Sequence, residues 1–178
     1  MTRRVSFVVG VDPGLSGAFA VLDPAAPFGT PLCPALVHVG DFPVLSGKSS
    51  SGRTRTYLDM HALISEFRNW APYGDAVSVA VEQVSAMPKQ GVSSTFRFGE
   101  AFGQVQGLMT AMGWSITRVE PARWKTDLRL RAGKDDARRR CIELWPAQAQ
   151  LFARAKDHGR ADAALIAMWL LTRRPVVS

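Results

Sequence analysis

Two acidic residues stand directly after apolar runs that are typical of buried β-strands. Asp12 follows SFVVGV, and Glu82 follows VSVAV. In open α/β sheets, ligands collect outside the carboxyl ends of the strands. A carboxylate at that position loses hydration, and a cation or a hydrogen-bond donor must offset the cost. Either residue alone would most often be a turn residue or a backbone-bonded acid, but two such acids in one small domain indicate a functional site.

Two further acids, Asp157 and Asp162, lie in KDHGRADAALIA, where an apolar helix begins. Within one helix, a separation of five residues is about 500° of rotation, which leaves two side chains about 140° apart. If the helix begins near Gly159, Asp157 lies in the preceding loop and Asp162 in the first turn, and both carboxylates can converge. His158 lies between them, and its ordinary interpretation is that it caps the helix or lies on the surface.

A cluster of oxygen ligands with no Cys and few His favours Mg²⁺ or Mn²⁺ over zinc. Two such ions about 4 Å apart activate a water and stabilise the leaving oxygen of an in-line displacement at phosphorus. The acids therefore predict a metal-dependent nuclease with two ions per active site.

The charge of the chain indicates a polyanionic partner. Its 22 Lys and Arg residues exceed its 15 Asp and Glu residues, which gives a net charge of +7. Nine basic and four acidic residues fall between positions 118 and 140. Most of these bases are Arg, whose planar fork suits phosphate, so DNA is the expected partner. A solvated helix face is the ordinary alternative, and an anionic membrane surface is a weaker one.

Composition excludes several other classes of protein. The 178 residues and 47% hydrophobic content favour a single domain over residues 1–178. No stretch approaches the roughly 18 apolar residues of a membrane span, and MTRRVSFVVGVD does not resemble a secretory signal. Cys33 and Cys141 are too few for a disulfide framework, so we expect a reducing, cytoplasm-like compartment.

The elements that must position these residues follow from hydrophobic periodicity and turn signals. We expect strands over residues 5–11, 18–22, 35–42, 76–82 and 114–119, and a mobile loop over 45–56. Helices are expected over 57–70, from Ser94 to Met112, from Pro121, over 134–145 and over 159–172. This order predicts an α/β fold, with a five-stranded mixed sheet and helices on both faces.

Three glycines, Gly99, Gly103 and Gly107, recur every four residues in the helix expected from Ser94 to Met112. Each costs a helix about 1 kcal/mol relative to Ala. Such a stripe predicts the close approach of another element, either the sheet of this chain or a second subunit.

The segments GVDPGLSGAFAVLD, VAVEQV and DHGRADAALIA, in that order, resemble the RuvC-type Holliday junction resolvases of the RNase H superfamily. MPKQGVSSTFRFGEAFG, EPARWK and GKDDARRR resemble the phage-type and chloroplast branch. The resemblance spans roughly residues 5–170. It implies an RNase H-like fold and a dimeric, Mg²⁺-dependent endonuclease that nicks opposed strands of a four-way DNA junction. It also implies the cytoplasm of a bacterial cell or a phage-infected host, and a dimer contact through the 94–112 helix.

The resemblance carries over to individual residues. Asp12, Glu82 and Asp162 match the family's acids. The bacterial enzymes place an Asp or His three residues before the last acid, where this chain has Gly159. Asp157 and His158 lie beside that gap, and we take Asp157 as the fourth ligand with His158 as the alternative. Lys125 and Lys134 resemble family lysines near the scissile phosphate, where a cation offsets developing negative charge.

The segment MPKQGVSSTFRF resembles the part of the family that reads DNA sequence. Its polar side chains can bond base edges or phosphates, and its rings can stack on bases at a junction. With the basic region, it gives these expected DNA contacts: Lys89, Gln90, Phe96, Arg97, Phe98, Arg123, Arg138 and Arg139. Core packing is the ordinary alternative for both phenylalanines.

Three other functions are weaker alternatives. DPGLSG is also similar to the first phosphate loop of actin-like ATPases, but 178 residues leave no room for their second half. A nuclease acting on RNA–DNA hybrids would use a similar acid cluster. A non-catalytic junction-binding protein would not need the complete acid set.

Overall fold

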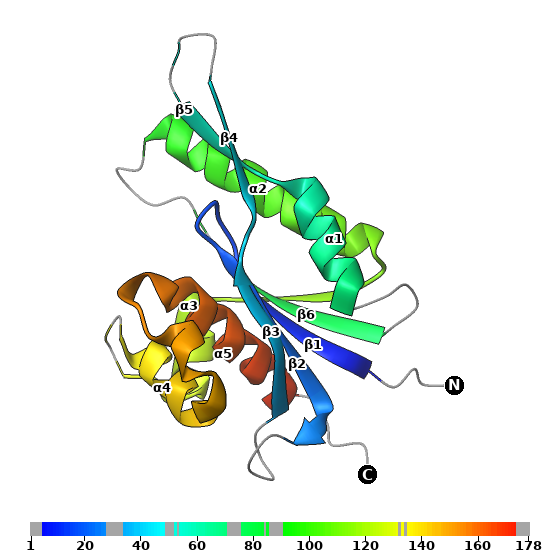
Figure 1. The fold of residues 1–178 in the computed structure, drawn as a ribbon, viewed down its shortest axis with the longest axis vertical. Coiled ribbons are helices and arrows are strands. Elements are labelled where there is room, and N and C mark those ends of the chain that lie inside the picture. Colours follow the sequence, from blue (N-terminus) through cyan, green and yellow to red (C-terminus); the bar gives the residue numbers. More distant parts are fainter. Residues whose placement is uncertain are drawn as a thin grey trace.

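A five-stranded mixed sheet forms the centre of the molecule (Figure 1). The computed structural model describes residues 5–27, 34–48, 52, 54–70, 76–83, 85, 91–131, 133 and 135–173. The strands are β1 (Val5–Asp12), β2 (Ala18–Pro27), β3 (Pro34–Asp41), β6 (Ala76–Glu82) and β7 (Ser115–Val119), in the order β3-β2-β1-β6-β7. β2 is antiparallel to β1 and β3, whereas β1, β6 and β7 are parallel.

The register of the parallel strands places the two strand-end acids side by side. β1 pairs with β6 through Gly10 opposite Ala80 and Val11 opposite Val81. Asp12 and Glu82 are the next residues of their strands, so both stand at the same edge of the sheet. This edge is the carboxyl end of the parallel strands, where α/β folds bind ligands.

Helices cover both faces of the sheet, as the sequence predicts. The helices α1 (Met60–Trp70) and α2 (Val92–Ala111) lie on one face (Figure 1). The opposite face carries α3 (Pro121–Asp127), α4 (Asp136–Leu144) and α5 (His158–Thr172), with the short 3-10 helices η1 (Pro146–Phe152) and η2 (Ala155–Asp157). Alternate residues of β1 enter two separate cores, with Val8 under α5 and Val9 under α1 and α2. The α/β fold class is confirmed.

The last helix lies unusually close to the sheet because small residues face each other. A Cβ added to Gly10 in β1 would lie 2.0 Å from the carbonyl oxygen of Ala163 and 2.3 Å from the amide nitrogen of Ala167. Any side chain at Gly10 would therefore push α5 away from β1. The same close packing continues to the start of α5, where a Cβ on Gly159 would lie 3.0 Å from Oδ2 of Asp12. This contact brings the start of α5 to the edge of the sheet that carries Asp12.

One element differs from the prediction. The segment expected to be a mobile loop contains an antiparallel hairpin, β4 (Val44–Lys48) and β5 (Thr54–Leu58), with Leu45 opposite Tyr57. All residues of β4 are exposed, so backbone pairing forms the hairpin without the apolar pattern that marks a buried strand. Tyr57 belongs to β5, and α1 starts only at Met60, where Oδ1 of Asp59 accepts the Ala62 N–H at 3.0 Å.

Other boundaries shift by a few residues. β2 continues to Pro27, beyond the expected end of the strand at residue 22. α2 starts at Val92 after Gly91, and no serine side chain caps it. No helix in the described part of the chain is both long enough and apolar enough to cross a membrane.

Candidate active site

Three carboxylates from distant parts of the chain lie near one another at a partly buried site. Burial and the negative charges of Glu82 and Asp162 raise the pKa of Asp12 from 3.8 to about 8, against the opposing effect of Lys125. Burial raises the pKa of Asp162 to about 6, with Glu82 adding to the rise and Lys125 opposing it. The pKa of Asp12 thus responds to both other acids, and the pKa of Asp162 responds to Glu82. β1, β6 and α5 bring together Asp12, Glu82 and Asp162, as the sequence predicts.

A buried tryptophan fixes the position of Glu82. Nε1 of Trp124 donates a hydrogen bond of 2.8 Å to Oε1 of Glu82, and the Trp124 side chain is fully buried in α3. Pro121 opens this helix at its first turn, immediately after β7. Trp124 was not predicted as a site residue. The available signal was the Trp in RWK, because a buried indole N–H requires a hydrogen-bond acceptor.

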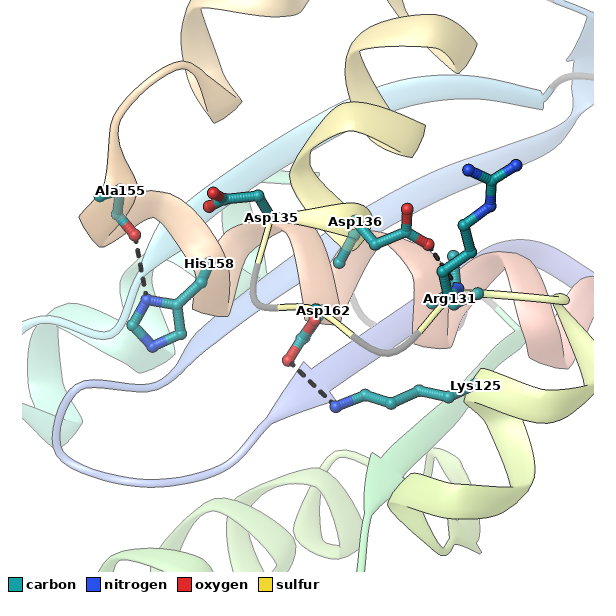
Figure 2. Close-up of a pocket in the computed structure, with 10 residues that line it drawn as sticks. Lys125, Arg131, Asp135, Asp136, Ala155, His158 and Asp162 are labelled. Carbon is teal, nitrogen blue, oxygen red and sulfur yellow. Dashed lines mark hydrogen bonds and ion pairs between the residues drawn. The ribbon is translucent and has the colours of Figure 1, made fainter.

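Lys125, the next residue along α3, provides the positive charge of the site. Its Nζ lies 4.0 Å from Oδ2 of Asp162 and points toward that carboxylate (Figure 2). The ammonium also lies 5.0 Å from the centre of the Trp124 ring. The same short helix therefore supplies a hydrogen bond to Glu82 and a cation to Asp162. Lys134, the other predicted lysine, lies outside the described residues.

The turn after Asp12 contacts the start of α2. Gly14 has φ of 142°, and a Cβ there would lie 3.2 Å from Cε2 of Phe98. Phe98 thus packs against the active-site turn, whereas Phe96 is 73% exposed. A groove at this place is lined by Asp12, Arg97, Phe98 and His158, among others. Lys89 and Gln90 lie outside the described residues, so their expected contacts stay predictions.

The structure gives the two candidates for the fourth ligand different positions. Asp157 is only 1% exposed, and its carboxylate accepts hydrogen bonds from the backbone N–H of Arg154 at 2.9 Å and from its Nη2 at 2.8 Å. Burial acts to raise the pKa of Asp157, but the bonds from Arg154 outweigh it and the pKa lies below its usual value. Nη1 of Arg160 lies 3.9 Å from the same carboxylate. Asp157 is therefore held by arginines at the start of α5.

His158 instead lines the hollows beside the carboxylates. It lines one hollow with Asp12 and another with Asp162, and its charge acts to lower the pKa of Asp162. Because α5 begins at His158, this residue and Asp162 are four positions apart in a helix and lie on the same face. Figure 2 shows His158 and Asp162 on the same helix, with Nδ1 of His158 3.3 Å from the carbonyl oxygen of Ala155.

The chemistry of the carboxylates fits a hard divalent cation, which prefers oxygen ligands. The raised pKa values of Asp12 and Asp162 show that the protein alone does not offset the cost of charging them. Among the described residues, however, no three His, Cys, Asp or Glu side chains are grouped closely enough to hold an ion as they stand. The side chains would have to draw together around a metal.

Three arginines expected to contact DNA have partners within the chain. Nη1 of Arg138 donates to the carbonyl oxygens of Phe152 and Ala153, and the side chain is 15% exposed, so Arg138 connects α4 to the end of η1. Arg123 pairs with Asp127 at 3.0 Å, and Arg139 pairs with Asp136. Arg123 and Arg139 remain largely exposed. Arg138 instead has a structural role, which a count of charged residues in the sequence cannot show.

The sheet order, the acids at the ends of β1 and β6, and the acid in α5 define the RNase H-like fold. Two solved structures of RuvC from Thermus thermophilus share it. One matches with a TM-score of 0.59 and 22% identity over 92% of each chain. The other, in complex with a Holliday junction substrate, matches with a TM-score of 0.56 and 21% identity over 92% of this chain and 90% of that one.

A sequence relative agrees with this fold. The chain is 38% identical to the chloroplastic Holliday junction resolvase MOC1 of Chlamydomonas reinhardtii, in an alignment of 106 residues that covers 56% of this chain. The match covers 12% of that larger protein. No family model matches the sequence. The structures and the relative confirm the resemblance to RuvC-type resolvases that the motifs indicated.

Proposed function

We propose that this chain is a structure-selective endonuclease that resolves four-way DNA junctions by paired, metal-dependent nicking. The observation that carries the proposal is the cluster of Asp12, Glu82 and Asp162, in which burial and the negative charge of Glu82 raise the pKa values of Asp12 and Asp162. Perturbed carboxylates at a strand edge are typical of catalytic sites. The similarity to MOC1, a resolvase, and to RuvC bound to a junction supports this substrate.

Asp12, Glu82 and Asp162 would hold Mg²⁺ or Mn²⁺, two ions per site. His158 is a better candidate for the fourth ligand than Asp157, because it lines the hollows that contain Asp12 and Asp162, whereas the carboxylate of Asp157 is bonded to Arg154. When bound, such ions supply an activated water and stabilise the leaving oxygen. Trp124 orients Glu82, and Lys125 places a positive charge beside Asp162 that also offsets charge on the phosphate. Lys134 has the same role by resemblance.

The groove beside Asp12 suits contact with DNA at the junction centre. Arg97 lines this groove at the start of α2, and the exposed Phe96 precedes it in the same helix. Arg97 can bond a phosphate, and Phe96 can stack on a base that junction geometry has already unstacked. Lys89 and Gln90 precede this segment and would contribute to the choice of cleavage sequence. Phe98 instead supports the turn at Gly14.

The glycine stripe of α2 supports a homodimer. A Cβ added at Gly99, Gly103 or Gly107 would meet no described atom within 4 Å, so the stripe does not pack on the sheet of this chain. The buried side of α2 is formed by Ala101, Val105 and Met109, which lie about 200° around the helix from the glycines. The stripe is open to the same helix of a second copy, and two copies would supply the two active sites needed for paired nicks.

Cleavage of matched substrates tests the proposal. Purified protein is incubated with a labelled four-way junction, a linear duplex of the same sequence and an RNA–DNA hybrid, with Mg²⁺ or with EDTA. We expect nicking of the junction only, and only with the metal. Preferential cleavage of the hybrid would indicate a hybrid nuclease. Tight junction binding without any cleavage in Mg²⁺ or Mn²⁺ would indicate a non-catalytic binding protein. A cytoplasmic location stays a prediction, since the curated relative is chloroplastic.

A further inference from the structure

Arg129 has a backbone conformation that is normally reserved for glycine. Its φ is 55°, and no other non-glycine residue in the described ranges has a positive φ. The residue follows α3, and its N–H bonds the carbonyl oxygen of Thr126 at 3.0 Å, while Leu130 N–H bonds that of Lys125 at 2.9 Å. Helices commonly end in this left-handed geometry, but Gly adopts it without steric cost and Arg does not. Strain of this kind is concentrated at functional sites.

The surroundings of Arg129 contain more positive charge than the chain neutralises. Arg129 lines a hollow with three other arginines, Arg131, Arg139 and Arg140, and with two acids. The two acids are already paired, Asp136 with Arg139 and Glu143 with Arg140. Within the part of the chain that the structure describes, the guanidinium groups of Arg129 and Arg131 have no acidic partner. Both residues are exposed.

This basic hollow adjoins the carboxylate site. Leu130, Arg131 and Asp136 line it and also line the neighbouring hollow that contains Lys125, His158 and Asp162. Figure 2 shows the hollow that contains Lys125, His158 and Asp162. The Arg131 guanidinium is directed away from Asp162. A continuous path therefore runs from the carboxylates, past the turn that contains Arg129, to the exposed side of α4.

We propose that Arg129, together with Arg131, binds the phosphodiester backbone of the DNA strand that enters the active site. The inference rests on the proposed function and adds a binding site to it. A polyanion that extends away from the carboxylates requires positive charge along its path, and the Arg fork matches phosphate oxygens. The contact explains why an arginine occupies a position at which glycine would be less strained.

Substitution by glycine separates binding from folding at this position. Arg129→Gly removes the charge and relieves the left-handed strain, so it should weaken DNA binding without lowering Tm. One phosphate contact contributes about 0.9 to the slope of log K against log salt on B-form DNA, which is about an 8-fold change per decade of salt. We therefore expect Arg129→Gly to bind a junction about 8-fold more weakly at 0.1 M salt than the wild type, with a slope about 0.9 shallower. The difference should vanish near 1 M.

Two control variants make the result specific. Arg129→Lys keeps the charge and should retain most of the slope. Arg68→Gln removes one arginine charge from α1, on the opposite face of the sheet, and should leave the slope unchanged. Binding is measured in EDTA by fluorescence anisotropy at several salt concentrations, on a junction and on a linear duplex, and Tm is measured in parallel.

The outcomes distinguish this inference from the proposed function. If Arg129→Gly binds with the wild-type slope, or if its Tm falls along with its affinity, the side chain supports the fold and the inference is overturned. If the wild type nicks junctions while Arg129→Gly is unaffected, only this inference fails. If the wild type neither binds nor nicks junctions, the proposed function itself fails.

Discussion

The buried carboxylate of Asp12 makes the stability of the metal-free protein depend on pH. Its pKa in the folded protein is about 8, against 3.8 when unperturbed. Between these values the folded protein retains the proton and the unfolded chain has lost it, so stability falls as the pH rises. Below about pH 4 both states are protonated. Above about pH 8 both are ionised, and the loss is complete.

The magnitude follows from the change in pKa. A rise of about four pH units at Asp12 corresponds to roughly 5 kcal/mol at about 1.36 kcal/mol per unit. Ionised carboxylates turn apart and admit water, which lowers the free-energy cost of ionising Asp12 in the folded protein. We therefore take about 2 kcal/mol as the lower limit of the loss in stability. For a chain of this length, 1 kcal/mol shifts Tm by about 2–4 °C, so the effect is at least about 4 °C.

Asp12→Asn removes the titrating group and keeps its shape. In EDTA at pH 8, we expect Asp12→Asn to melt at least about 4 °C above the wild type, with a smaller difference at pH 5. Addition of Mg²⁺ at pH 8 should raise the Tm of the wild type more than that of the variant, because a cation offsets the carboxylate charge. The assay is thermal unfolding at pH 5, 6.5 and 8, with and without the metal.

Asp23→Asn is the matched control, since Asp23 lies on β2 outside the cluster and its bond from the Ala25 N–H can be kept by an amide oxygen. Its Tm should follow the wild type at every pH. If the curves of the wild type and Asp12→Asn are parallel from pH 5 to 8, Asp12 is not a buried member of a carboxylate cluster, and the reasoning is refuted.

Three further predictions concern the parts around the site. Trp124→Phe keeps a smaller aromatic ring in the core but removes the hydrogen bond to Glu82, so it should cost at least about 1 kcal/mol in stability and slow nicking at saturating junction; an unchanged rate would show that Glu82 needs no positioning. His158→Ala should slow metal-dependent nicking with little change in Tm, whereas Asp157→Asn should lower Tm by several degrees because it weakens the buried bonds from an arginine; the reverse pattern would make Asp157 the ligand. Gly103→Leu should convert a dimer to a monomer in analytical ultracentrifugation, and a dimer that persists would place the contact elsewhere.

The strands and the acids could be predicted because each depends on local pattern. β1 and β6 are apolar runs that end in an acid, and the ends of adjacent parallel strands must coincide. The hairpin formed by β4 and β5 was missed because its exposed strands bury almost no side chains, and its backbone pairing leaves no mark on hydrophobic periodicity.

The fourth ligand could not be settled from the sequence, because the answer depends on where α5 begins. A helix that starts at His158 puts this residue on the same face as Asp162 and turns Asp157 toward Arg154. Arg138 shows a similar limit, because the carbonyl oxygens that bind it belong to residues 152 and 153, and only the fold brings them within reach.

Cleavage of a supercoiled plasmid that extrudes a cruciform tests the central claim most directly. Paired nicks across the four-way junction give a linear product, whereas a single nick lets the cruciform collapse and leaves a nicked circle. We predict linear product from the wild-type protein in Mg²⁺, and intact plasmid both in EDTA and from Asp12→Asn in Mg²⁺. Intact plasmid or nicked circles alone from the wild type in Mg²⁺ and Mn²⁺, or linear product from Asp12→Asn, would contradict the account.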